Sequence, residues 1–113
     1  MTDAANGANA AQREYWNHDG GANWLAMQER VERQLAPLGR RAIERAAFQA
    51  GEHVLDIGCG TGRTTLEIGA RVGARGTAIG VDISRPLLAV ARERLHEAGA
   101  ANVSFREADA QTA

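Results

Sequence analysis

The sequence predicts an α/β domain in which three parallel strands lie in the order 3-2-1, preceded by two N-terminal helices. A short apolar segment at 54–57 is followed by glycine at every second position, as expected for a buried strand and its turn. Two more strand-like segments, 77–81 and 103–107, alternate with helical patterns. Right-handed crossovers place such consecutive strands side by side, which gives the order 3-2-1.

The part of the chain before the first strand is expected to divide in two. Residues 1–14 are mostly small and polar without periodicity, so we expect a disordered leader. Residues 15–50 predict a helical segment, with one helix over 24–36 and a second over 38–47. Pro37 separates the two because proline has no amide hydrogen to donate within a helix.

The strand-containing part, residues 51–113, has the order β-α-β-α-β. The glycine turn leads into a helix that we expect over 61–72. The second helix has Ser84 as a candidate N-cap, and Gly99 marks its end. The third strand, 103–107, is the last expected element.

Composition limits the classes of function. With 113 residues, 44% of them hydrophobic and 24% charged, the chain is typical of a single globular domain. A net charge of −1 gives no basic surface for nucleic acid or an anionic membrane, and no segment approaches the about 20 apolar residues of a membrane span. The single cysteine excludes a disulfide framework, and the histidines lack metal-ligand spacing, so we expect a cytoplasmic protein without a metal site.

The strongest functional signal is the stretch 54–62, VLDIGCGTG. A strand, a glycine turn and a helix N-terminus in succession form a cofactor cradle. Backbone N–H groups point out of the helix start, and glycine lets a ligand approach the main chain. The dinucleotide fingerprint G-x-G-x-x-G would require a third glycine at position 63, where the chain has Arg63.

This stretch resembles motif I of the class I (Rossmann-like) S-adenosylmethionine-dependent methyltransferases in its acid, its three glycines and the preceding strand. The resemblance extends over about residues 15–110 and implies a three-layer αβα fold. The family's sheet has seven strands, so this chain would supply the cofactor-binding half with an incomplete sheet. The strand 54–57 would then be an unpaired apolar edge, at which self-association is possible.

Each predicted strand ends near an acidic residue: Asp56, Asp82 and Asp109. Ligands of open α/β sheets bind at the carboxyl ends of the strands, so we expect these carboxylates around one cleft. Asp82 can accept hydrogen bonds from both hydroxyls of a ribose, whether of S-adenosylmethionine or of NAD. The alternative is that Asp82 caps the following helix.

The resemblance assigns further roles. It implies that Asp109 accepts from the adenine amine, that the N–H of Ala110 meets an adenine ring nitrogen, and that Ile83 packs on the adenine face. Asp56 and the carbonyl of Gly58 would contact the methionine end. The expected cofactor-binding residues are therefore Asp56, Gly58, Cys59, Gly60, Gly62, Asp82, Ile83, Asp109 and Ala110.

For several of these residues, a purely structural role stays open as an alternative to cofactor binding. Asp109 could be a solvated acid in a turn, and Ile83 could be ordinary core. Cys59 has no base at a known spacing, so we interpret it as a small residue that fits the turn rather than as a nucleophile.

Three of the five aromatic residues, Tyr15, Trp16 and Trp24, fall in the N-terminal segment. In many methyltransferases such a segment folds over the cofactor, so these residues form a possible lid. An aromatic wall also suits a sulfonium through cation–π attraction. The alternative is that they pack the N-terminal helices onto the sheet.

The leading hypothesis is the cofactor-binding portion of a methyltransferase that transfers the methyl group of S-adenosylmethionine to a small-molecule acceptor. No catalytic residue can be named. One alternative is a non-catalytic cofactor-binding or interaction fragment without the acceptor half. Another is half of an NAD-dependent oxidoreductase, against which the glycine spacing argues.

Overall fold

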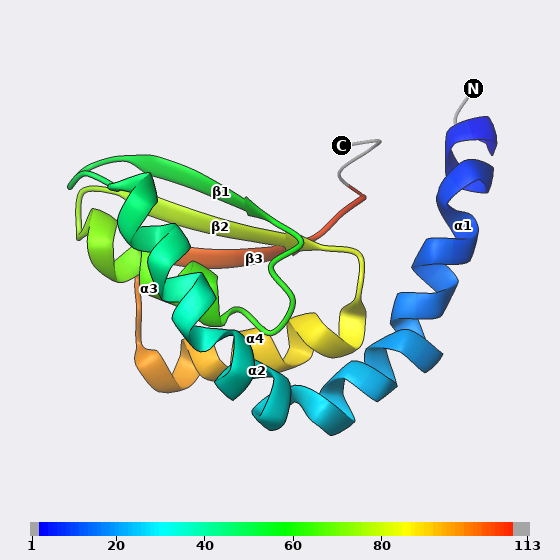
Figure 1. Cartoon of the computed structure of the whole chain (residues 1–113). Coiled ribbons are helices and arrows are strands. Elements are labelled where there is room, and N and C mark those ends of the chain that lie inside the picture. The colour runs from blue at the N-terminus through cyan, green and yellow to red at the C-terminus, as the bar shows by residue number, and fades with distance from the viewer. Residues whose placement is uncertain (1–2, 110–113) are drawn as a thin grey trace.

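In the computed structural model, which describes residues 3–109, a parallel sheet of three strands is covered on one face by helices (Figure 1). The strands are β1 (His53–Ile57), β2 (Thr77–Asp82) and β3 (Val103–Glu107). They pair in the order β1-β2-β3, which confirms the predicted order. The register aligns Asp82 at the end of β2 with Glu107 at the end of β3.

The connecting helices are α3 (Arg63–Val72) and α4 (Arg85–Ala98), close to the predicted ranges. Both lie on the same face of the sheet because two right-handed crossovers in the same direction place their helices together (Figure 1). The Rossmann-like α/β fold is thus confirmed. Of the three expected layers, residues 3–109 form two, the sheet and one layer of helices.

The core lies between the sheet and these helices. Alternate residues of each strand face the helices, as the period of two requires. The Ser84 hydroxyl accepts from the backbone N–H of Leu87 at 3.4 Å, which confirms the expected N-cap of α4. The buried hydrophobic cluster consists of Ile43, Ile68, Val72, Ala78, Leu88, Ala91, Val103 and Phe105.

The N-terminal part differs from the expectation in two ways. Residues 3–14 of the expected disordered leader belong to α1 (Asp3–Asn17), and frequent alanine, the best helix former, favours this helix. Residues 1–2 lie outside the described part of the chain. The two helices expected on either side of Pro37 are one helix, α2 (Asp19–Ala46). Pro37 is exposed, and tertiary contacts hold α2 on both sides of it, through Glu32 before it and Ile43 of the core cluster after it.

β1 has no neighbour on its outer side among the described strands, as predicted. The face of β1 that points away from the helices carries Leu55 and Ile57, whose exposed fractions are 58% and 62%. This part of the described fold therefore leaves an apolar sheet surface in contact with solvent, next to the unpaired edge of β1.

Gly62 allows a direct test of the packing beneath the glycine turn. Its φ is +82°, and a Cβ would lie 2.6 Å from Cζ of Phe105 and 2.8 Å from Cβ of Ala91. We expect Gly62→Ala to lower the free energy of unfolding by about 1–2 kcal/mol for the left-handed backbone and about 1–3 kcal/mol more for overpacking. Urea unfolding measures the loss.

Gly99→Ala is the matched control, because Gly99 has a φ of +63° and open space where its Cβ would stand. In this variant, the free energy of unfolding should fall only by the part due to the left-handed backbone. Equal losses in the two variants would contradict the predicted clash.

Candidate cofactor site

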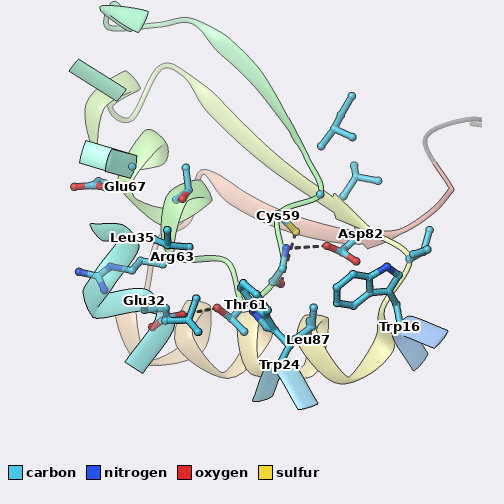
Figure 2. Close-up of a pocket in the computed structure, with 18 of the residues that line it drawn as sticks. Trp16, Trp24, Glu32, Leu35, Cys59, Thr61, Arg63, Glu67, Asp82 and Leu87 are labelled. Carbon is cyan, nitrogen blue, oxygen red and sulfur yellow. Dashed lines mark hydrogen bonds between the residues drawn. The ribbon is translucent and has the colours of Figure 1, made fainter. Parts of the chain in front are cut away.

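A cavity of about 1090 Å³ opens at the carboxyl ends of β1 and β2 and is bounded by the glycine turn and α2 (Figure 2). Asp82 and Asp109 both line it, whereas Asp56 is outside the lining. Two of the three acids that the sequence placed around one cleft are therefore brought together there. The Asp56 carboxylate instead accepts from the Thr65 hydroxyl of α3 at 2.7 Å.

The glycine turn exposes its main chain to this cavity. Gly58 and Gly60 line it with φ of +72° and +56°, and a Cβ on either would meet no atom within 4 Å. The N–H groups of Gly58 and Cys59 both donate to the Val81 carbonyl, at 2.7 and 3.1 Å, which fixes the turn to β2. A ligand can thus approach this backbone closely, as a cofactor cradle requires.

Asp82 joins the glycine turn to the loop after β2. One carboxylate oxygen accepts from the Gly60 N–H at 2.8 Å, and the other accepts from the Ser84 N–H at 2.9 Å. Because an ionised carboxylate offers about four lone-pair positions, Asp82 keeps capacity for a ligand's hydroxyl groups. The N-cap contact of α4 itself is made by the Ser84 side chain.

Asp109 lies on the cavity wall with only 5% of its surface exposed. It accepts from the Asn9 amide of α1, and the Arg13 guanidinium is 3.8 Å from its carboxylate. The burial rules out a solvated turn acid. Ile83 is half-buried in the cavity lining and is not part of the core cluster. Ala110 lies outside the described residues.

Burial controls the protonation of two groups at this turn. It raises the pKa of Asp56, an effect that the Thr65 hydrogen bond opposes and the negative charge of Asp82 reinforces. Burial, together with the charges of Asp82 and Asp56, raises the pKa of the Cys59 thiol to about 12. The thiol is therefore protonated near neutral pH, which supports a small residue fitted into the turn rather than a nucleophile.

Two of the three possible lid aromatics, Trp16 and Trp24, line the cavity. Figure 2 shows Trp16 on the side of Asp82 and Trp24 near Thr61. Tyr15 is 49% exposed and is not in the lining, but its ring packs edge to face on that of Trp16, with centroids 5.2 Å apart. The helix corner that carries Trp16 thus forms one wall of the cavity.

Asn17 fixes this corner to the loop that follows Asp82. Its amide donates to the Ile83 carbonyl at 2.9 Å, and its carbonyl oxygen accepts from the Arg85 N–H at 2.8 Å. The Ser84 hydroxyl adds a bond to the Trp16 carbonyl at 2.7 Å. The corner between α1 and α2 is therefore attached beside Asp82.

The sequence analysis missed an ion pair on the opposite side of the cavity. Glu32 of α2 and Arg94 of α4 join at 2.8 and 2.9 Å through two nitrogens and two oxygens. Glu32 also accepts from the Thr61 hydroxyl at 2.7 Å. These residues come from distant parts of the chain, and no local pattern in the sequence links them.

No group of three or more His, Cys, Asp or Glu side chains within the described part of the chain is arranged to hold a metal ion. None of the helices that the structure describes has both the length and the apolar character needed to cross a membrane.

Comparison with known proteins identifies the family. A sequence model described as a methyltransferase domain matches residues 48–113. The chain belongs to the methyltransferase domain family. A curated relative, aklanonic acid methyltransferase DauC of Streptomyces sp. (strain C5), is 38% identical over 76 residues, which are 67% of this chain and 34% of that enzyme. The predicted class I S-adenosylmethionine-dependent family, and with it the type of cofactor, is confirmed.

Two solved structures place the fold in context. Coclaurine N-methyltransferase, solved with N-methylheliamine and SAH, is 28% identical with a TM-score of 0.59, over 66% of this chain and 22% of that one. The [4+2]-cyclase SpnF is 28% identical with a TM-score of 0.56, over 65% of this chain and 26% of that one. The chain thus spans about a third of DauC and about a quarter of each of these enzymes.

The raised pKa of Asp56 predicts how stability depends on pH. The folded state binds this proton more tightly than the unfolded chain, so ionisation of Asp56 opposes folding. The destabilisation is absent below the ordinary pKa of about 4, grows as pH rises toward the folded pKa, and is complete above it. We expect Asp56→Asn, whose amide oxygen can still accept from Thr65, to raise the free energy of unfolding at pH 7.

Denaturant unfolding between pH 4 and 8 measures this difference, which should shrink toward pH 4. Thr65→Val should have the opposite sign at pH 7, because it leaves the buried carboxylate without its hydroxyl donor. An Asp56→Asn chain that is less stable than wild type at pH 7 would refute the prediction.

Proposed function

We propose that this chain is the cofactor-binding portion of an enzyme that transfers the methyl group of S-adenosylmethionine to a small-molecule acceptor. The observation that carries the proposal is Asp82, which lines the cavity next to a glycine turn whose main chain is open to a ligand. Two of its acceptor positions hold backbone N–H groups, and the others remain for a ribose.

The cavity residues fit the two ends of this cofactor. On the adenosine side, we assign the ribose hydroxyls to Asp82, the adenine face to Ile83 and the adenine amine to Asp109, followed by the N–H of Ala110. The common cavity wall supports these roles for the three described residues, and Asp109 is also buried. On the methionine side, we assign contacts to the main chain at Gly58, Cys59 and Gly60, which line the cavity. Gly62, which the sequence also predicted to bind the cofactor, is outside the lining, and a Cβ there would meet Phe105 and Ala91.

Asp56 has a supporting part in this proposal. It lies outside the cavity lining but only two residues before Gly58, and its charge is close enough to raise the pKa of Cys59. A negative charge there favours the cationic amino and sulfonium groups of the cofactor electrostatically.

The N-terminal segment, residues 15–50, acts in this proposal as a lid. Trp16 and Trp24 line the cavity and would exclude water from the sulfonium while attracting its charge through their π faces. Tyr15 supports Trp16 through its edge-to-face contact and does not itself reach the cavity.

S-adenosylmethionine supplies an electrophilic methyl group, and alignment of the acceptor with it is the main catalytic contribution of the protein. We assign no general base, and Cys59 is not a candidate because its thiol stays protonated near neutral pH. We also propose a cytoplasmic location, consistent with the single cysteine, and neither a nucleic-acid nor a membrane partner, given the net charge of −1.

A second function deserves a test because of one observation: the similar enzyme SpnF is described as a [4+2]-cyclase. The fold thus occurs in an enzyme of another reaction class, and cofactor binding does not by itself imply methyl transfer. The corresponding alternative for this chain is a cofactor-binding or interaction fragment without methyl transfer of its own.

The test of cofactor binding is calorimetric titration of the chain with S-adenosylhomocysteine, with NAD as the comparison ligand. We expect saturable binding of the first and none of the second. Hydrogen bonds to a charged group contribute about 1.5–3 kcal/mol each, so Asp82→Asn should weaken binding by about tenfold to more than a hundredfold.

Glu107→Gln is the matched control. Glu107 aligns with Asp82 on the neighbouring strand but is not in the cavity lining, and it pairs with Arg85 at 3.8 Å. The Glu107→Gln variant should bind S-adenosylhomocysteine with the affinity of wild type. A folded Asp82→Asn variant with unchanged affinity would remove Asp82 from the site.

We further propose that two copies of the chain associate at β1, through its unpaired edge and the exposed apolar side chains of Leu55 and Ile57 beside that edge. Leu55→Lys places a charge on this surface outside the cavity lining. In sedimentation velocity over a range of concentrations, we expect wild type to associate and Leu55→Lys to sediment as a smaller species. A wild-type chain that stays monomeric at the highest concentration would contradict self-association.

A further inference from the structure

Three elements meet at the cavity wall opposite Asp82. Glu32 of α2, Arg94 of α4 and Thr61 of the glycine turn form what we call the clamp. The Arg94 guanidinium bonds both oxygens of Glu32, and it also donates to the Thr61 hydroxyl at 3.1 Å and to the Thr61 carbonyl at 3.4 Å. The Thr61 hydroxyl in turn donates to Glu32 at 2.7 Å (Figure 2).

Glu32 lines the cavity, yet its bonds argue against a role in proton transfer. Both of its oxygens are engaged, and its side chain and that of Arg94 are only 17% and 27% exposed. The Arg94 hydrogen bond, followed by the Thr61 bond and the charge of Arg94, holds the Glu32 pKa below its ordinary value despite burial. With these hydrogen bonds, the Glu32 carboxylate holds Arg94 and Thr61 in place.

The group that Glu32 holds lies at the centre of the turn. Thr61 is 5% exposed and stands between Gly60, which donates to Asp82, and Gly62, whose φ is +82°. Glycine restricts the backbone less than any other residue, so the geometry of this turn depends on what fixes the residue between the two glycines. The clamp supplies three of the bonds at Thr61.

The clamp also positions α2. Trp24 precedes Glu32 by eight residues, or about two helical turns, and lines the same cavity. A bond from Glu32 to the glycine turn therefore sets the distance between the lid wall and the main chain of the cradle.

We propose that Glu32 and Arg94 are positioning residues for the cofactor, which hold the glycine turn and α2 in the geometry that binds it. The inference rests on the proposed function and deepens it. It implies that loss of the clamp weakens cofactor binding by more than any loss of folded protein explains.

The test is titration of the full chain with S-adenosylhomocysteine, with urea unfolding of each variant in parallel. Glu32→Gln keeps the shape of the side chain but removes the charge paired with Arg94. We expect its dissociation constant to rise at least about tenfold, while unfolding shows that the variant is folded under the titration conditions.

Thr61 provides a rescue pair. Thr61→Val removes the hydroxyl at nearly constant shape and should weaken binding, whereas Thr61→Ser keeps the hydroxyl and should bind within about threefold of wild type. Glu107→Gln breaks an exposed ion pair of α4 away from the cavity and should bind as wild type does.

A measurement without ligand separates this inference from the proposed function. In a Trp16→Phe background Trp24 is the only tryptophan, and acrylamide quenching of its fluorescence reports how closely α2 covers the cavity. We expect Glu32→Gln to increase quenching and Glu107→Gln to leave it unchanged.

Wild-type affinity in Glu32→Gln, or a loss explained by its unfolded fraction, would overturn the positioning role. So would unchanged quenching of Trp24. A wild-type chain that does not bind S-adenosylhomocysteine would instead overturn the proposed function, and increased quenching in Glu32→Gln would still support the clamp as the attachment of α2.

Discussion

The hydrogen bond from the Gly60 N–H to the Asp82 carboxylate is the contact on which the site depends. It joins the turn after β1 to the end of β2, so that two strand ends form one surface. The Ser84 N–H on the other oxygen extends this connection to the start of α4. A single half-buried carboxylate thereby orders three backbone segments and still has acceptor capacity for a ligand.

The N-terminal helices complete the cavity through polar attachments on two sides. Hydrogen bonds of Asn17 and Ser84 hold the corner between α1 and α2 beside Asp82. The Glu32–Arg94 ion pair holds α2 beside the glycine turn. Exposed apolar side chains remain on β1, so the same fold that closes the cavity leaves an edge open to association. The proposed cofactor site, at the carboxyl ends of β1 and β2, therefore adjoins the surface of β1 that is proposed for self-association.

Family membership and reaction are separate conclusions here. The methyltransferase domain match and the relative DauC establish the family, while the similarity to the cyclase SpnF shows that this fold is not confined to methyl transfer. The chain spans about a third of DauC, and the residues assigned in the proposal are those of the cofactor cradle. The cradle residues therefore support a proposal about the cofactor more directly than one about the acceptor.

The sequence by itself determined the strands, the glycine turn, the Ser84 cap and the strand order, because these follow from local backbone preferences and from the handedness of crossovers. Only the tertiary structure decided that α2 continues through Pro37, that Asp56 faces Thr65 instead of the cavity, and that Glu32 meets Arg94 across 62 positions of sequence. Such pairings depend on which faces of distant elements pack together. Local patterns carry no information about that packing.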